Sequence, residues 1–234
     1  MKLGGALVAG VMLVLAPAAA QARPAAKAAA VHDWTKSVAI TPAGGFRMGN
    51  PAARVRLIEY GSLACPHCRH FEEDAFKPLE AYVRTGKVSY EFRNMVLNAP
   101  DIAVSLLTRC AGPAKFFAMS QTVYATQPDW EKRLETISAA DRAALDQMSD
   151  QQQLLRYAEL GGLTTIAAQF GVTAARARQC LADQEGLDRL LGMSRAANAV
   201  GVTHTPTFAI NGKIRSELAT WDEVEPALKA ALKG

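Results

Sequence analysis

The spacing of apolar residues changes along this chain, and the changes divide it into elements. Residues 54–60 (RVRLIEY) nearly alternate between polar and apolar side chains, as in a strand with one buried face. From residue 66 to about residue 85 the apolar residues recur at steps of three and four, which predicts a helix that ends at Gly86. Pro78 lies inside this helix, where we expect a kink.

Strand patterns also lie on either side of this pair. Residues 37–40 and 88–96 have the composition of strands. Residues 44–51 are rich in glycine and end in Asn-Pro, so we expect a turn-rich connection there rather than a strand.

The second half of the chain is mostly helical in pattern. Between residues 99 and 199 only helical periodicity is found, interrupted by Gly and Pro. Strand patterns return at 207–210 and 213–214 around Asn211-Gly212, a strong hairpin signal, and a last helix follows at 221–232. The order β, β, α, β, many helices, β, β, α predicts an α/β unit interrupted by an all-helical insertion.

The first 22 residues have the three-part layout of a secretory signal peptide. Lys2 precedes an apolar run, and a stretch of small residues then offers cleavage sites after Ala20 or Ala22. The alternative is an uncleaved membrane anchor, for which the apolar run is short. In both cases the body of the protein faces an oxidising compartment, and we expect the periplasm.

The composition is that of a globular protein with a small positive charge. The formal net charge of the 234 residues is +4, which does not indicate a nucleic-acid or membrane-surface partner. After the signal peptide we expect a leader and first strand (23–43), the first part of the α/β domain (44–98), the helical insertion (99–199) and the second part of the domain (200–234).

The candidate chemistry lies in Cys65-Pro66-His67-Cys68, where a strand becomes a helix. Two thiols two residues apart can open and close a disulfide, and the thiolate is the nucleophile. Cys65 occupies the N-cap position and Pro66 suits the first helical position, so backbone N–H groups and the helix dipole favour an anion on Cys65. A protonated His67 would add a positive charge. We therefore expect Cys65 to be the exposed, low-pKa attacking thiol and Cys68 the more buried resolving thiol.

Other interpretations of this motif are a metal site and a structural disulfide. Half of a zinc site has the same spacing, and His70 could supply a third ligand beside Cys65 and Cys68. No second close group of Cys or His follows, so we expect redox chemistry and no metal.

The chain resembles the DsbA family of thiol:disulfide oxidoreductases. The resemblance rests on the 65–68 motif, on the segment Gly201 to Phe208 followed by Asn211-Gly212-Lys213, and on the helical block, and it covers roughly residues 44–232. It implies a thioredoxin fold, with a central mixed sheet flanked by helices and an inserted helical subdomain. It implies no cofactor other than the redox-active disulfide.

The resemblance also implies that the Thr205–Pro206 bond is cis, beside the active cysteines. A cis bond holds a sharp turn and leaves neighbouring backbone groups free to pair with an extended substrate next to Cys65. The alternative is an ordinary trans turn that enters a strand. Thr205 stands where DsbA oxidants often have valine and isomerase relatives often have threonine, which leaves both activities open.

Glu59 lies six residues before Cys65, where the DsbA family has an acidic residue. A buried carboxylate there would relay the proton of Cys68 and oppose formation of its thiolate. The alternative is a solvated strand residue paired with Arg93 or Arg56.

Cys110 and Cys180 are the two cysteines outside the motif. In an exported protein they are expected to be bonded to each other. Some alphaproteobacterial DsbA-like proteins are similar, with a second, structural disulfide. Two buried thiols and a redox-active regulatory pair are the alternatives.

These features together predict an exported oxidoreductase that donates its Cys65–Cys68 disulfide to folding proteins through a mixed disulfide. The family implies reoxidation by a DsbB-type membrane partner, and the lack of room for a separate dimerisation domain favours a monomer. The alternatives are an isomerase or reductase, a peptide-binding chaperone with incidental cysteines, and a metal-delivery protein.

Overall fold

The structure is a computed structural model that describes residues 1–2, 4–5, 10 and 32–234. It divides into two units, residues 1–31 and residues 32–234, and every element below belongs to the second unit. The predicted signal-peptide cleavage sites at Ala20 and Ala22 lie outside the described residues. Within the described ranges, no helix is long and apolar enough to cross a membrane.

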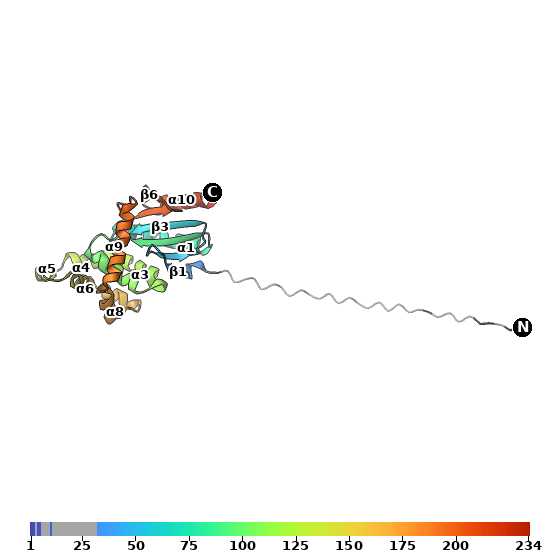
Figure 1. The fold of residues 1–234 in the computed structure, drawn as a ribbon, viewed down its shortest axis with the longest axis horizontal. Helices are drawn as coiled ribbons and strands as arrows, with labels where there is room; N and C mark the ends of the chain where they lie inside the picture. The colour runs from blue at the N-terminus through green and yellow to red at the C-terminus, as the bar shows by residue number, and fades with distance from the viewer. Residues whose placement is uncertain (3, 6–9, 11–31) are drawn as a thin grey trace. The chain divides into compact units, whose positions relative to one another are not determined.

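The centre of the second unit is a sheet with the strand order β1-β2-β4-β3-β5-β6 (Figure 1). β3 and β4 run parallel, and the other neighbours are antiparallel. The parallel pair forms the middle of the sheet. The loop from the carboxyl end of β3 to α1 therefore starts at the centre of the sheet and not at its edge. The strands are β1 (Val38–Ile40), β2 (Phe46–Gly49), β3 (Val55–Gly61), β4 (Val88–Asn94), β5 (Thr207–Ile210) and β6 (Lys213–Arg215).

The prediction of a turn at residues 44–51 is wrong, because β2 lies within it. Phe46 and Met48 are both buried, as two residues on one face of a strand are, and β2 pairs with β4. The ring of Phe46 stacks on that of Phe116, with centroids 3.8 Å apart. Because glycines flank this short alternation, the sequence does not distinguish it from a turn. The packing of Phe46 and Met48 in the core makes the segment a strand.

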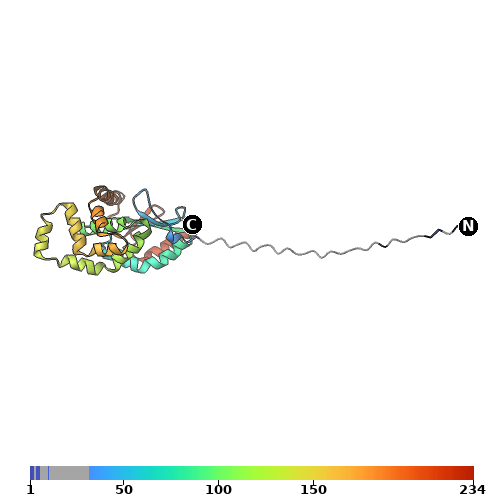
Figure 2. The same cartoon turned by 90° about the horizontal axis from the view of Figure 1, so that it is seen from below.

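Two helices from opposite ends of the sequence pack together on the sheet. The first, α1 (Pro66–Arg84), continues through Pro78, and the second is α10 (Trp221–Lys233). Phe71 of α1 contacts Phe208 of β5, with ring centroids 4.6 Å apart, and lies near Trp221 of α10. In Figure 2 the two helices lie on the same face. A 3-10 helix at Trp34–Lys36 packs against α1 and β2.

The insertion between β4 and β5 is helical throughout and packs around its first helix. In Figure 1 its outer helices lie at the opposite end of the sheet from α10. One hydrophobic core joins the insertion to the sheet, since Phe116 and Phe46 belong to the same cluster. The helices are α2 (Ala99–Cys110), α3 (Pro113–Ala125), α4 (Gln127–Glu135), α5 (Ala139–Leu145), α6 (Asp150–Leu160), α7 (Leu163–Gln169), α8 (Ala174–Leu181) and α9 (Gln184–Ala199).

Candidate active site

The two cysteines of the motif lie where α1 begins. Cys65 is the N-cap residue, with extended backbone angles, and Pro66 is the first residue of the helix. The prediction that Cys65 is exposed is wrong, because the residue is only 5% exposed and its thiol donates a hydrogen bond to the carbonyl oxygen of Thr205 at 3.3 Å. Cys68 is fully buried, whereas Pro66 and His67 are exposed.

Hydrogen bonds lower the pKa of Cys65 to about 5, although burial opposes the shift. The largest cause is the side chain of Cys68, followed among the favourable causes by the side chain of Thr205 and by the backbone N–H groups of Cys68 and His67. The amides at the start of the helix therefore act as the sequence predicted. The leading contributions come from neighbouring side chains and not from the predicted charge on His67.

Cys68 has the opposite tendency. Burial is the largest cause that raises the pKa of its thiol well above the usual value, and the hydrogen bond with Cys65 and the negative charge of Glu59 add to it. Its sulfur accepts the backbone N–H of Ser62 at 3.5 Å. Two thiols one helical turn apart thus differ in protonation at neutral pH.

Glu59 projects from β3 into the interior beside these thiols. It is 1% exposed, and the hydroxyl of Tyr90 donates to its Oε2 atom at 2.6 Å. Burial raises the pKa of this carboxyl to about 8. A Cβ atom at Gly61 would lie 2.5 Å from the ring of Phe92 and 2.7 Å from Oε1 of Glu59, so a glycine there leaves room for both side chains.

The alternative of a surface ion pair at Glu59 is wrong. Arg93 instead pairs with Glu91, its Nε atom lying 2.7 Å from Oε1. Glu91 is one position along β4 from Phe92, the register partner of Glu59, so the two carboxylates face opposite sides of the sheet. Arg56, the other cation considered, is exposed.

A second buried carboxyl group, which was not predicted from the sequence, holds the active-site loop. Ser62 donates to Oδ2 of Asp101 at 2.6 Å, and the backbone N–H of Leu97 donates to the same oxygen at 2.9 Å. Ser105 donates to Oδ1 at 3.3 Å. Asp101 is fully buried, and burial raises its pKa to about 6. An aspartate in the first turn of a helix resembles an ordinary capping residue, so its position in the sequence gave no signal.

Two further side chains of the insertion bind the same loop. The hydroxyl of Tyr124, on α3, donates to the carbonyl oxygen of Ser62 at 3.0 Å. The amide of Gln127, on α4, donates to the carbonyl oxygen of Leu63 at 3.0 Å. Both side chains are buried, so the insertion positions the loop that precedes Cys65.

The Thr205–Pro206 peptide bond is cis and lies against the motif. Thr207 at the start of β5 is the register partner of Tyr60 at the end of β3, which brings the bond next to the cysteine loop. Thr207 also fixes the turn, because its hydroxyl donates to the carbonyl oxygen of His204 at 2.7 Å.

The other two cysteines form a disulfide away from this site. Cys110 at the end of α2 and Cys180 in α8 are joined with an S–S distance of 2.03 Å across a sequence separation of 70. His70, the third ligand of the metal hypothesis, is exposed and lies 3.4 Å from Glu73. Within the described part of the chain, no group of three or more His, Cys, Asp or Glu side chains is arranged to hold a metal ion.

Comparison with known proteins places most of the chain in one family. A family model described as "Thioredoxin" matches residues 41–230. A protein of Rickettsia bellii provisionally named protein-disulfide oxidoreductase is 26% identical over 192 residues, which are 80% of this chain and 64% of that protein. This chain thus spans less than two thirds of the length of that relative. Disulfide bond formation protein D of Bacillus subtilis is 21% identical, over 80% of this chain and 77% of that protein.

Two solved structures have a similar fold. The crystal structure of a protein-disulfide isomerase from Novosphingobium aromaticivorans superposes with a TM-score of 0.75 at 29% identity, covering 80% of this chain and 97% of that one. Alpha-DsbA1 of Wolbachia pipientis superposes with a TM-score of 0.63 at 23% identity, covering 82% and 91%. The similarity to alpha-DsbA1 shows a shared fold only.

Proposed function

Because this chain belongs to the thioredoxin family and has a DsbA-like fold, we propose that it is a protein thiol:disulfide oxidoreductase. The predicted thioredoxin fold with a helical insertion is confirmed. The observation that supports the activity best is the opposite pKa shift of two thiols in one CxxC motif, downward at Cys65 and upward at Cys68. This asymmetry gives one thiol the role of attacking and leaving group and the other the role of resolving group.

The proposed reaction starts from the Cys65–Cys68 disulfide. A substrate thiolate attacks the Cys65 sulfur, the bond between the two cysteines breaks, and Cys68 leaves and takes a proton. A second substrate thiolate then attacks the substrate sulfur of the mixed disulfide, and Cys65 leaves as a thiolate. Two electrons pass from the substrate to the protein. In the reverse direction Cys68 attacks Cys65 and resolves the mixed disulfide.

Glu59 is suited to supply the proton that Cys68 takes. Its carboxyl group has a pKa of about 8, so it holds a proton at neutral pH. Once that proton is given up, the negative charge of Glu59 is among the causes that raise the pKa of Cys68, so the thiol of Cys68 keeps the proton. Thr205 and Pro206 would hold an extended substrate segment beside Cys65, because the Thr205 carbonyl already reaches the Cys65 thiol.

The direction of the reaction follows from the stabilised thiolate. Whatever lowers the pKa of Cys65 stabilises the reduced protein, and the disulfide becomes a stronger oxidant. We therefore infer that the protein oxidises cysteine-containing exported proteins in the periplasm, without a further cofactor. A membrane protein of the DsbB type would reoxidise it.

One observation favours disulfide isomerisation as a second candidate. The Novosphingobium structure, 29% identical to this chain, is described as a protein-disulfide isomerase, and Thr205 precedes the cis proline here. An isomerase works in its reduced form, so it rearranges scrambled disulfides without net oxidation.

Single-cysteine variants in the thiol form, mixed with a substrate that carries an activated disulfide, test the proposal. Cys68→Ala is expected to accumulate a mixed disulfide with an activated substrate disulfide, and Cys65→Ala is expected to form none. Equilibrium of wild type with glutathione then separates the two candidates. A potential near the ~−120 mV of strong oxidants supports oxidation, and one near the ~−270 mV of thioredoxin contradicts it. A Cys65→Ala variant with full activity would contradict both candidates.

A further inference from the structure

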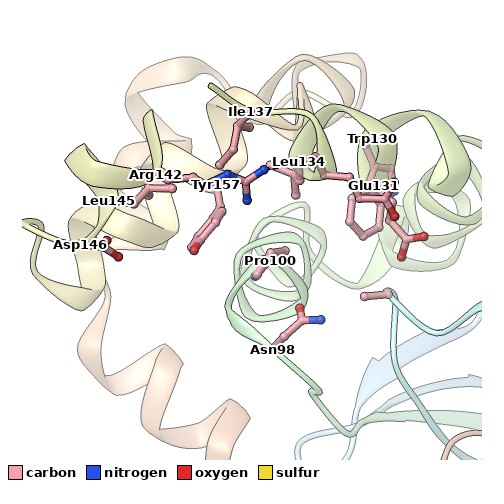
Figure 3. A pocket seen from close by; sticks show the side chains of 12 residues that line it. Asn98, Pro100, Trp130, Glu131, Leu134, Ile137, Arg142, Leu145, Asp146 and Tyr157 are labelled. Carbon is pink, nitrogen blue, oxygen red and sulfur yellow. Dashed lines mark hydrogen bonds between the residues drawn. The ribbon is translucent and has the colours of Figure 1, made fainter. Parts of the chain in front are cut away.

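A cavity of about 630 Å³ opens beside the active-site loop and extends over the insertion (Figure 3). It begins at Ala64, the residue before Cys65, and passes the start of α2 at Asn98 and Pro100. From there α4, α5 and α6 line it. We call this cavity the insertion pocket. Its volume lies within the range of sites that bind ligands or side chains.

The inner wall of the insertion pocket is apolar and fixed. Trp130 is 1% exposed, and its indole N–H donates to the carbonyl oxygen of Val123 at 3.1 Å, which holds the ring in place. Leu134 and Ile137 extend this wall, and Tyr157 of α6 also lines the cavity (Figure 3). Such a wall favours an apolar or aromatic side chain from a partner.

The charges that line the insertion pocket are mostly negative. Glu131, Glu135 and Asp146 contribute carboxylates, and Arg142 contributes the cation. Arg142 is already engaged, because its guanidinium donates to the carbonyl oxygen of Glu135 at 2.9 Å. The pocket therefore has more anionic than cationic groups available to a ligand, and a cation there would be attracted.

The insertion pocket and the reactive sulfur are electrostatically close. Burial and the charge of Glu135 raise the pKa of Glu131, the charge of Arg69 opposes this, and the charge of Cys65 makes a smaller contribution in the same direction as Glu135. Ala64 joins the two sites covalently. A polypeptide attached to Cys65 through a mixed disulfide thus has the pocket within reach of its neighbouring residues.

We propose that the insertion pocket binds the substrate polypeptide next to its reacting cysteine and selects segments with an apolar or aromatic side chain beside a lysine or arginine. This inference rests on the proposed oxidoreductase function and names the class of substrate it prefers. The occupant is the substrate chain, since the pocket is continuous with the active-site loop and its charge is complementary to a basic segment.

Matched dithiol peptides test the inference in single turnovers. Peptides with two cysteines, identical except for a Lys-Phe, Glu-Phe or Lys-Gly pair placed at successive positions from the cysteine, are mixed with the oxidised full-length protein. Rate constants come from acid quenching and mass spectrometry of the alkylated thiols. At the best position, Lys-Phe is expected to react about fivefold or more faster than either other peptide, which corresponds to more than ~1 kcal/mol.

Variants in which amides replace carboxylates test whether the insertion pocket causes the preference for the Lys-Phe peptide. The ratio of the Lys-Phe to the Glu-Phe rate is expected to fall towards one in Glu131→Gln/Asp146→Asn and to stay at the wild-type value in Asp222→Asn, which removes an exposed charge from α10. Because each protein is compared with itself, a general loss of activity cancels. The Lys-Phe over Lys-Gly preference is expected to weaken in Leu134→Gln.

The possible outcomes distinguish a failure of this inference from a failure of the proposed oxidoreductase function. Equal rates for all peptides in wild type, or ratios that the pocket variants leave unchanged, would overturn the insertion pocket as a substrate site. A ratio that falls as the protein concentration rises would assign the pocket to a second copy of this chain instead. No disulfide transfer to any peptide or to glutathione would overturn the oxidoreductase function itself.

Discussion

The sulfur of Cys65 lies among hydrogen-bond donors that an exposed thiol would not have. The Cys68 thiol, the Thr205 side chain and two backbone N–H groups all lower the pKa of Cys65, and together they outweigh burial. Desolvation alone would raise the pKa of a thiol, as it does at Cys68. The sequence allowed the helix-start amides to be predicted, and the family resemblance placed Thr205 beside the cysteines. The hydrogen bond between Thr205 and Cys65 was not predicted, because 140 residues separate the two and no local pattern indicates the contact.

The reactivity of the reduced protein is expected to titrate at Cys65. The rate of alkylation by iodoacetamide should have its midpoint near pH 5 and should be lost in Cys65→Ala. A midpoint near pH 8.5, the ordinary value of a thiol, would contradict the hydrogen-bond account.

The same shift makes the stability of the reduced protein depend on pH. The folded pKa of about 5 lies below the unfolded value, so ionisation of Cys65 stabilises the folded reduced chain and this contribution is lost as the pH falls through 5. The Tm of the reduced protein minus that of the oxidised protein is therefore expected to decrease from pH 7 to pH 5 in thermal unfolding. The oxidised form has no such thiol and serves as the control.

Glu59→Gln is expected to slow the chemistry and to stabilise the fold at neutral pH. The amide keeps the contact with Tyr90 but cannot transfer a proton, so at pH 7 the rate of disulfide transfer should fall by roughly 10²-fold. The folded pKa of about 8 exceeds the unfolded value, so the carboxyl group makes the wild type less stable as the pH rises from 4.5 to 8. The Tm gain of the variant should therefore be present at pH 7 and shrink towards pH 4.5.

Glu91→Gln provides the matched control for this experiment. Glu91 is a buried carboxylate on the neighbouring strand, but it faces the other side of the sheet and binds Thr41 and Arg93. Its substitution should leave the disulfide-transfer rate unchanged. Equal rate losses in the Glu59 and Glu91 variants would show that any buried charge of the sheet matters, and the proton role of Glu59 would be wrong.

Among the elements, α2 connects the active site to the rest of the insertion. Asp101 in its first turn binds Ser62 of the cysteine loop, and Cys110 at its other end forms the disulfide with Cys180 of α8. The helix was predictable from its apolar spacing. The contacts at its two ends were not equally predictable. Four cysteines in an exported chain indicate that Cys110 and Cys180 are bonded, whereas nothing in the sequence indicates that Asp101 binds Ser62.

Loss of the Cys110–Cys180 bond is expected to affect stability rather than chemistry. In Cys110→Ala/Cys180→Ala the free energy of unfolding should fall by up to ~4 kcal/mol, the chain-entropy value for a loop of 70 residues, as measured by urea denaturation. The glutathione equilibrium of Cys65–Cys68 is the control and should not change. A stability loss below ~1 kcal/mol, or a shifted equilibrium, would contradict a purely structural role.

Across the whole molecule, the order of elements followed from the sequence except at β2. The spacing of apolar residues and the positions of Gly and Pro were enough to predict the long elements. Phe46 and Met48 form an alternation between glycines that is too short to be distinguished from a turn. The motif at Cys65 was equally visible. The insertion pocket was not, because side chains from several separate segments form it and no one segment has its pattern.

The three hydrogen bonds from the insertion to the cysteine loop limit how the two parts can be exchanged. A minimal scaffold made by deleting residues 99–199 would lose Asp101, Tyr124 and Gln127 together. The hydroxyl of Ser62 would lose its acceptor and the carbonyl group of Leu63 its donor, and the carbonyl group of Ser62 would keep only the backbone N–H of Cys65. The reactive motif therefore depends on side chains of the insertion and cannot be transferred alone. Its transplantation into a simpler thioredoxin needs a carboxyl, a phenol and an amide brought along from outside the grafted segment.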